Sequence, residues 1–189
     1  SHLKRLNEDV QPYVDEYCAH VIHLKDKLGT VFLQLHGNFG PKNFDRVIRF
    51  IEQWPKEIRL AVEFRHTDWF NDERVATELY ELLENNNVSN IITDTAGRRD
   101  LLHMRLTSNE AFIRYVGANH TSDYSRLDEW VERLKIWKDQ GISNIHFFVH
   151  QNLEVESPLL AGYFIKKLNT HLNTQLHIPG HTSNNFTLF

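Results

Sequence analysis

The alternation of short apolar runs with amphipathic stretches restricts the fold of this chain more than any other feature. Five compact runs are apolar on both faces and read as strands: 30–37, 58–65, 88–95, 111–117 and 143–152. Strands of this kind are typical of parallel sheets that are covered on both sides. Amphipathic stretches join them, which predicts right-handed crossovers onto a parallel sheet. The expected fold class is therefore α/β.

Five stretches carry apolar residues at helical spacing, namely 9–29, 41–54, 71–87, 125–141 and 157–172. In the first stretch, Tyr17, Val21 and Leu24 form the expected packing stripe. Asn71 and Ser125 are expected to cap the starts of the third and fourth helices. The connection 96–109 is the longest without a helical pattern, and a loop of this length is a candidate for a functional role.

The composition fits a single globular domain over residues 1–189. Hydrophobic residues make up 41% of the chain and charged residues 24%, which is enough to build a core. Residues 173–189 show no period and predict an irregular C-terminal tail. No run approaches about 18 apolar residues, so no membrane span is expected. Because Cys18 is the one cysteine, an intrachain disulfide is excluded and a cytoplasmic location is expected.

The segment "AVEFRHTDWF", residues 61–70, places an acid and a base inside a strand that is otherwise apolar. Because strand side chains alternate between faces, Leu60, Val62 and Phe64 share one face, and Glu63 and Arg65 share the other. The apolar set suits the side that helices cover, so the acid and the base are expected to point inward. Burying an ion pair costs desolvation that Coulomb attraction only partly returns, and a functional role is therefore considered.

Polar residues also stand near the C-terminal ends of the other predicted strands. They are Gln34 and His36 in the first, Asp94 in the third, Arg114 in the fourth with Asn119 and His120 in the following loop, and His150 and Asn152 in the fifth. Ligands bind at this end of the strands in both barrels and open α/β sheets. The pattern across five strands predicts one shared site there.

Each of these residues also has a purely structural interpretation. Glu63 and Arg65 would then form an ion pair that fixes the interior, and Asp94 would cap a turn. His36 and His150 would be neutral, hydrogen-bonded core histidines. Trp69 lies beside the polar pair, and packing over a loop competes with stacking on a ligand.

Several segments resemble the DUF72 (YecE-like) family. They are "LGTVFLQLHG", "AVEFRHTDWF", "IRYVG" followed by Tyr124, "SPLLAG" and the initial "SHLKRLNE". Two departures are "VHQN" at residues 149–152, where the family has an "FNN" type of motif, and Thr67 with Asp68, where it often has a small residue and Ser. The "EFRH…W" match is the specific one.

The resemblance implies a TIM-barrel-like fold without an established biochemical activity. It also implies a shared pocket that contains Glu63, Arg65, His66, Trp69 and Arg114. An eight-unit barrel takes about 250 residues, and five units are visible in this chain. The chain is therefore expected to supply the C-terminal five β/α units of a longer barrel.

The first functional hypothesis is an enzyme, for example a hydrolase, acting on a small polar or anionic substrate at the barrel mouth. Glu63 would be the acid or base, Asp94 a second carboxylate, and Arg65 with Arg114 a clamp for an anion. Histidines would transfer protons; the candidates are His36, His66 and His150. A divalent metal would fit on two carboxylates and a histidine, but no spacing requires any cofactor.

Two alternatives stay open at this point. In the first, a nucleic-acid-binding barrel uses four arginines with Trp69 and Tyr124 as stacking platforms; the arginines are Arg98, Arg99, Arg105 and Arg114. A formal net charge of −4 makes this partner less favoured. In the second, the chain is a non-catalytic binding protein, which the fold alone does not exclude. The oligomeric state is not predicted.

Overall fold

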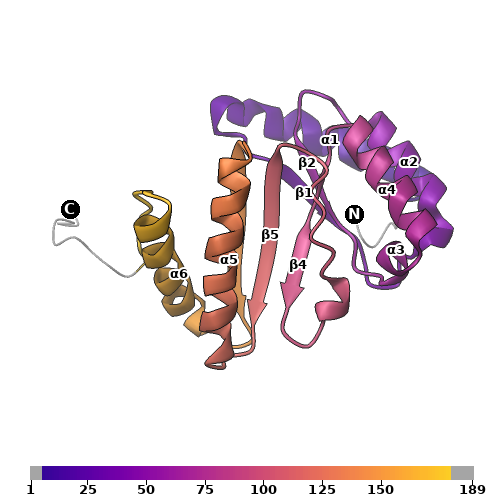
Figure 1. Cartoon of the computed structure of the whole chain (residues 1–189). Helices are drawn as coiled ribbons and strands as arrows, with labels where there is room; N and C mark the ends of the chain where they lie inside the picture. Colours follow the sequence, from indigo (N-terminus) through magenta and orange to yellow (C-terminus); the bar gives the residue numbers. More distant parts are fainter. Residues whose placement is uncertain (1–5, 180–189) are drawn as a thin grey trace.

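Helices and strands alternate along the computed structural model, which describes residues 6–179 (Figure 1). The strands are β1 Val31–Gln34, β2 Leu60–Glu63, β3 Ser89–Asn90, β4 Ile92–Thr95, β5 Glu110–Gly117 and β6 Asn144–Gln151. The α-helices are α1 Gln11–Val21, α2 Phe44–Gln53, α3 Asp68–Asn71, α4 Glu73–Asn85, α5 Ser122–Asp139 and α6 Ser157–His171. Short 3-10 turns occupy Glu8–Val10, Ile22–Lys27, Pro41–Asn43, Arg99–Leu101 and Glu154–Glu156.

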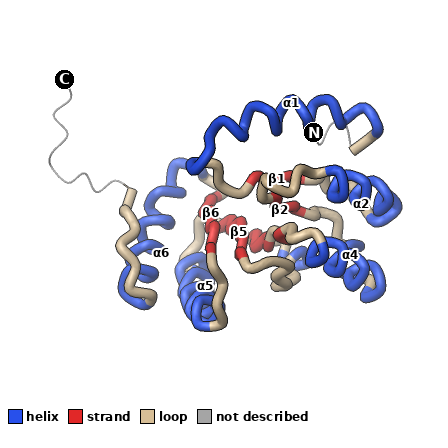
Figure 2. The backbone as a smooth tube through the Cα atoms, turned by 90° about the horizontal axis from the view of Figure 1, so that it is seen from above, coloured by secondary structure: helices blue, strands red, loops and turns tan. Residues whose placement is uncertain are grey.

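The strands form two three-stranded sheets, ordered β1-β2-β3 and β4-β5-β6. Every pairing is parallel, and neighbours in each sheet follow one another along the chain. The predicted α/β class with parallel strands is thus confirmed. The strands within residues 6–179 do not close into a barrel, because β1 and β6 each keep one edge without a partner strand. Seen from above, helices lie outside the strands (Figure 2).

The predicted third strand, 88–95, is broken at Ile91 into β3 and β4. The side chain of Thr107 fills the place of a neighbouring strand, because its Oγ1 accepts from the N–H of Asn90 (2.8 Å) and donates to the carbonyl of Val88 (2.6 Å). The Nε2 of His103 lies 3.2 Å from the carbonyl oxygen of Ile91. The long connection 96–109 therefore folds back onto residues 88–91 and satisfies their backbone where a neighbouring strand would.

The helices cover the face of each sheet that carries the apolar half of the strand pattern. Beneath α5 and α6 the core contains the apolar residues that stand at helical spacing in α5, namely Leu127, Trp130, Val131, Leu134 and Trp137. A second core lies under α1, α2 and α4 and includes Val14, Cys18, Val47, Ile51, Leu79 and Leu83. At about 25 cal/mol per Å² of buried apolar area, these two clusters supply the main driving force for folding.

Some local expectations were wrong. Asp72, rather than Asn71, caps α4, since its Oδ1 accepts from two N–H groups of the first turn. The helix α5 begins before Ser125, which lies inside its first turn. On α1 the buried residues are Val14 and Cys18, while Tyr17 is exposed. The apolar face of this helix is therefore rotated by about one residue from the predicted stripe.

The structure describes neither end of the chain completely. Residues 173–179 have no regular secondary structure, and residues 180–189 of the expected irregular tail lie outside the described part. Most of the "SHLKRLNE" segment, residues 1–5, also lies outside it. Within residues 6–179, none of the helices combines the length and the apolar character that crossing a membrane requires.

Candidate functional site

The strand register assembles one layer of side chains on the face opposite the helices. Gln34 on β1 is paired with Glu63 on β2, and Thr93 on β4 is paired with Arg114 on β5, which is paired with Phe148 on β6. Residues paired across a parallel ladder point to the same face. We call the four polar residues among them the polar layer: Gln34, Glu63, Thr93 and Arg114. Gln34, Glu63 and Arg114 lie in the C-terminal half of their strands, where α/β proteins bind ligands, and Thr93 is the second residue of the short strand β4.

Glu63 is the centre of the polar layer, and its residue is 1% exposed. Its Oε2 accepts a hydrogen bond from Gln34 Nε2 at 2.8 Å and a second from Arg114 Nη1. Its Oε1 lies 3.6 Å from Arg65 Nε, which is an ion pair without a hydrogen bond. The contact with Arg114 joins the two sheets, because Glu63 belongs to one and Arg114 to the other. The structure thus brings together the first acid and three of the predicted partners.

The charge of this cluster favours an anion. Two guanidinium groups face one carboxylate, and the side chains of Arg65 and Arg114 remain 48% and 23% exposed. Among the described residues, Glu63 is the only ion-pair partner found for either arginine. A guanidinium carries five N–H donors and holds carboxylate or phosphate with two parallel hydrogen bonds. Donors therefore remain for a bound oxyanion.

Thr93 belongs to the same layer and was not singled out from the sequence. The residue is 6% exposed, and its Oγ1 has no hydrogen-bond partner among residues 6–179. The signal was present in the strand "IITDT", where alternation places Thr93 on the face opposite Ile92.

Asp94 lies on the other face of β4, beneath α5. Its Oδ2 accepts from Trp130 Nε1 at 2.8 Å, and its Oδ1 accepts from Arg126 Nη2 at 2.6 Å and from Arg99 Nη1 at 3.2 Å. The structure does not bring Asp94 into the polar layer with Glu63. The expected pair of carboxylates facing one cavity is not formed. In the described part of the chain, no three His, Cys, Asp or Glu side chains group as metal ligands would.

A neighbouring carboxylate completes the structural network under α5. The carboxylate of Asp123 accepts from the N–H groups of Ala118 and His120, each at 3.0 Å. Burial raises the pKa of Asp123, but these hydrogen bonds outweigh it and hold the pKa below its usual value. Arg126 lies between Asp94 and Asp123 and contacts both. This buried network fixes α5 on the sheet.

Trp69 lies in the core rather than at a ligand surface. The residue is 0% exposed, its ring meets Phe64 edge-on with 5.0 Å between centroids, and its Nε1 donates to the carbonyl of Phe39 at 2.7 Å. The short helix α3 turns the ring inward below the loops that follow β1 and β2. A buried ring with a satisfied N–H offers no face for stacking, so the structural interpretation of Trp69 holds.

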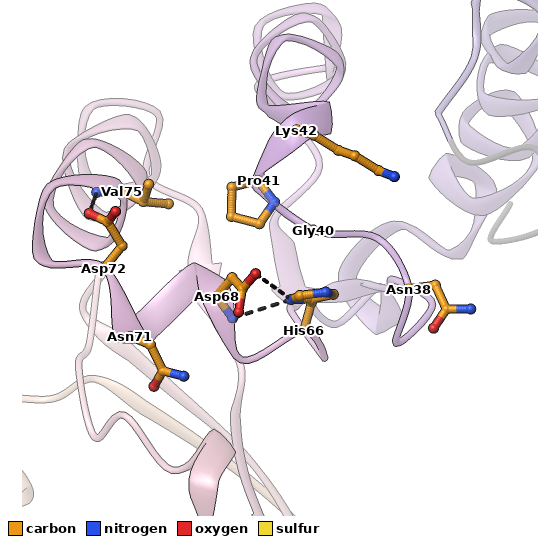
Figure 3. Close-up of a pocket in the computed structure, with 9 residues that line it drawn as sticks. All are labelled: Asn38, Gly40, Pro41, Lys42, His66, Asp68, Asn71, Asp72 and Val75. Carbon is orange, nitrogen blue, oxygen red and sulfur yellow. Dashed lines mark hydrogen bonds and ion pairs between the residues drawn. The ribbon is translucent and has the colours of Figure 1, made fainter.

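His66 lines a shallow pocket of about 630 Å³ outside the polar layer (Figure 3). Its Nδ1 accepts from the N–H of Asp68 at 3.2 Å, and its ring lies against Gly40, where an added Cβ would come within 3.2 Å of it. The other lining residues are Asn38, Pro41, Lys42, Asn71, Asp72 and Val75. Because Glu63 and Arg114 do not line this pocket, His66 and the polar layer form separate features.

The remaining candidates stand at the rim formed by the loops after the strands. His36 is exposed, and His150 pairs with Glu154 at 3.2 Å. Asn119 links two loops, since its N–H donates to Gln151 Oε1 and its Oδ1 accepts from the N–H of Leu153. Three further candidates are exposed: His120, Tyr124 and Asn152. Among residues 6–179, none of these six forms a hydrogen bond or an ion pair with Glu63 or Arg114, so they lie outside the centre of the polar layer.

The arginines of the nucleic-acid hypothesis are dispersed in ion pairs. Arg98 pairs with Asp100, and Arg105 pairs with Glu84. Arg99 is bound to Asp94 and Arg114 to Glu63. Binding single-stranded nucleic acid requires a continuous basic groove with exposed aromatic rings. These four arginines lie in separate ion pairs instead.

A family model described as "Protein of unknown function DUF72" matches residues 1–183. The chain belongs to the DUF72 family. The DUF72 chain is 25% identical over 167 residues to the UPF0759 protein YecE of Escherichia coli strain K12, an alignment that covers 78% of this chain and 61% of YecE. The same similarity is found to YecE of Escherichia coli O157:H7.

Solved structures of DUF72 family proteins share the fold. One from Thermotoga maritima MSB8 has a TM-score of 0.67 and 22% identity, with 85% of this chain and 66% of that chain covered. One from Enterococcus faecalis V583 has a TM-score of 0.65 and 18% identity, with 86% and 64% covered. The DUF72 chain thus spans less than two thirds of the length of these relatives.

Proposed function

We propose that this DUF72 chain is an enzyme that binds a small polar or anionic substrate against the polar layer, with Glu63 as its acid or base. The observation that carries the proposal is the buried carboxylate of Glu63, which is held through Oε2 alone. Gln34 and Arg114 occupy that oxygen, and Oε1 has no hydrogen bond among the described residues. One oxygen is thus fixed, and the other is left to exchange a proton with a bound molecule.

The charge balance of the site supports an anionic substrate. Arg65 and Arg114 flank a single carboxylate and retain unused N–H donors, so an added oxyanion would complete the charge pairing. Burying this cluster opposes stability, since the desolvation of buried ions is only partly repaid by their attraction. A well-packed apolar layer would serve folding equally well, which favours a binding role for these residues.

The placement of Asp94 restricts the chemistry. Hydrolysis by a pair of carboxylates requires both groups to flank the scissile bond, about 5–10 Å apart on one cavity. Asp94 faces the helices instead, where Trp130 and Arg126 occupy its oxygens. We therefore favour proton transfer by the single carboxylate of Glu63, next to an anionic group held by the arginines, over a two-carboxylate hydrolase.

The test compares two buried carboxylates that differ in position. Glu63→Gln and Glu110→Gln each break a carboxylate–arginine pair, since Glu110 is 4% exposed and pairs with Arg59 at the start of β5. Binding of acetate and ethyl phosphate is measured by ligand-observed NMR, together with the melting temperature of each variant. We expect both variants to melt earlier and only Glu63→Gln to change anion binding.

Two results would count against the proposal. Equal anion binding by wild-type protein and Glu63→Gln would leave the ion pair a purely structural role. Loss of anion binding in both Glu63→Gln and Glu110→Gln would show that the binding signal depends on folding and not on the site. Turnover of any bound anion then separates an enzyme from a non-catalytic binding protein, because Glu63→Gln would abolish turnover and leave the Arg114 side chain in place.

We further propose that the two sheets are part of a closed β/α barrel. The sequential strand order, the helices on the outside and the unpaired edges of β1 and β6 support it (Figure 2). Phe32 and Phe148 are 52% and 43% exposed on these edge strands, as interior side chains are when neighbouring strands are missing. We expect amide hydrogen exchange at the β1 and β6 edges to slow in a chain extended to the length of the relatives. Unchanged exchange in the longer chain would contradict closure.

A further inference from the structure

Thr93 is the one member of the polar layer whose polar group has nothing to bind. It is paired with Arg114 in the register of β4 and β5, so it points to the face that carries Glu63. The residue is 6% exposed, and its Oγ1 lacks a partner within the described residues. Gln34 and Arg114 each donate a hydrogen bond to Glu63, while the Thr93 hydroxyl on the same face makes none within residues 6–179.

An unpaired buried hydroxyl is unfavourable and rare. Folded proteins satisfy nearly all buried polar side-chain atoms, because the desolvation of a hydroxyl is otherwise not repaid. Valine has the same shape as threonine, is well suited to a strand and lacks the unpaired group. Packing alone therefore does not account for Thr93, and a bound molecule that pairs with Oγ1 does.

The polar groups on the same face as Thr93 define what such a molecule must carry. Arg114 and Arg65 supply donors, which match an oxyanion. Oε1 of Glu63 can only accept while the carboxylate is ionised, and the Thr93 hydroxyl can both donate and accept. A ligand hydroxyl satisfies both requirements, because it can donate to Glu63 and accept from Thr93.

We propose that Thr93 is a ligand-binding residue, and that the ligand is a small oxyanion with a hydroxyl on the first or second carbon from the anionic group. The oxyanion lies on Arg114, and its hydroxyl lies between Thr93 and Glu63. This inference rests on the proposed anion site and adds the substrate class to it. A 2-hydroxycarboxylate and the phosphate ester of a polyol share this chemistry, and the experiment separates them.

The experiment uses two matched pairs of probes that differ by one hydroxyl. Acetate is compared with glycolate, and ethyl phosphate with 2-hydroxyethyl phosphate, by ligand-observed NMR titration on wild-type protein, Thr93→Val and Thr93→Ser. In wild-type protein one hydroxylated probe binds about threefold to tenfold more tightly than its partner, as one added hydrogen bond allows. This advantage disappears in Thr93→Val and is retained in Thr93→Ser.

The melting temperature provides an independent readout. Thr93→Val raises it, because the variant removes an unpaired buried hydroxyl and keeps the shape of the side chain. A hydroxyl advantage that is absent in wild-type protein, or that survives in Thr93→Val, overturns the role of Thr93 while the anion site stands. If neither acetate nor ethyl phosphate binds, the proposed function itself fails and the inference fails with it. A lower melting temperature for Thr93→Val with an unchanged hydroxyl advantage would assign Thr93 a structural role.

Discussion

Lowering the pH should destabilise this protein through His103, which belongs to the connection 96–109 that folds back onto residues 88–91. Its ring lies near the carbonyl of Ile91 through Nε2, and its Nδ1 accepts from the N–H of Arg105 at 3.2 Å. These two contacts suit the neutral ring with its proton on Nε2. Burial lowers the pKa of His103 from 6.5 to about 4, and the hydrogen bond to Ile91 offsets only part of that effect.

The direction and the size of this change in folding stability follow from proton linkage. The unfolded chain binds a proton at His103 as the pH falls below 6.5, whereas the folded protein resists it down to about pH 4. The stability contributed by the neutral ring is therefore complete near pH 7 and is lost as the pH falls through this window. At about 1.4 kcal/mol per pKa unit, roughly 2 kcal/mol is lost between pH 7 and pH 5. Since the ring is partly accessible, about 1 kcal/mol is the expected measured value.

The assay is urea unfolding at pH 7, 6 and 5 for wild-type protein and His103→Gln. Glutamine keeps an N–H donor for the carbonyl of Ile91 and does not titrate. If the protonation of His103 had no effect on folding, the unfolding free energies of the two proteins would differ by the same amount at every pH. We expect the wild-type protein to lose about 1 kcal/mol more than the variant between pH 7 and pH 5. Parallel pH profiles for the two proteins would refute the buried neutral histidine as the cause.

Two further predictions concern the packing of α5. Gly117→Ala should cost about 1–3 kcal/mol of unfolding free energy, because the new Cβ would lie 2.8 Å from Asp123 Oδ2, and Gly29→Ala is the matched control with nothing within 4 Å. Urea unfolding that finds equal costs for both glycines would contradict this reason. Trp130→Phe should cost about 1–3 kcal/mol, because Oδ2 of Asp94 loses its buried donor at 2.8 Å. Unfolding of this variant at the wild-type urea midpoint would show that the hydrogen bond contributes no net stability.

Strand pattern and spacing were sufficient to predict the parallel α/β architecture and to place Glu63 and Arg114 on one face of it. Alternation within residues 58–65 separates Glu63 from its apolar neighbours, and the same rule applied to "IRYV" places Arg114 on the corresponding face. The prediction worked because parallel strands with helices outside leave one face for each set of residues. The ion pair between two sheets then follows from both residues standing in the same layer.

The break at Ile91 could not be predicted from the strand itself. It depends on the side chains of His103 and Thr107, which belong to the following connection and satisfy the backbone of β3 in place of a strand. Likewise, Trp69 follows the polar pair by a few residues, yet a single turn of α3 carries its ring into the core. Such contacts between separate segments leave no periodic signal in the sequence.

The position of Asp94 shows how the face of a strand residue decides its role. In "IITDT" Asp94 stands two residues after Ile92, so the two have the same parity, which means that they point to the same face of the strand. Ile92 is fully buried under the helices, and Thr93 has the opposite parity. Polarity near a strand end therefore identifies two different groups of residues. Those that share parity with apolar neighbours, as Asp94 does, bind helix side chains such as Trp130 and hold the layers together. Those of opposite parity, as Thr93 and Arg114 are, point to the face opposite the helices, where we propose that the ligand binds.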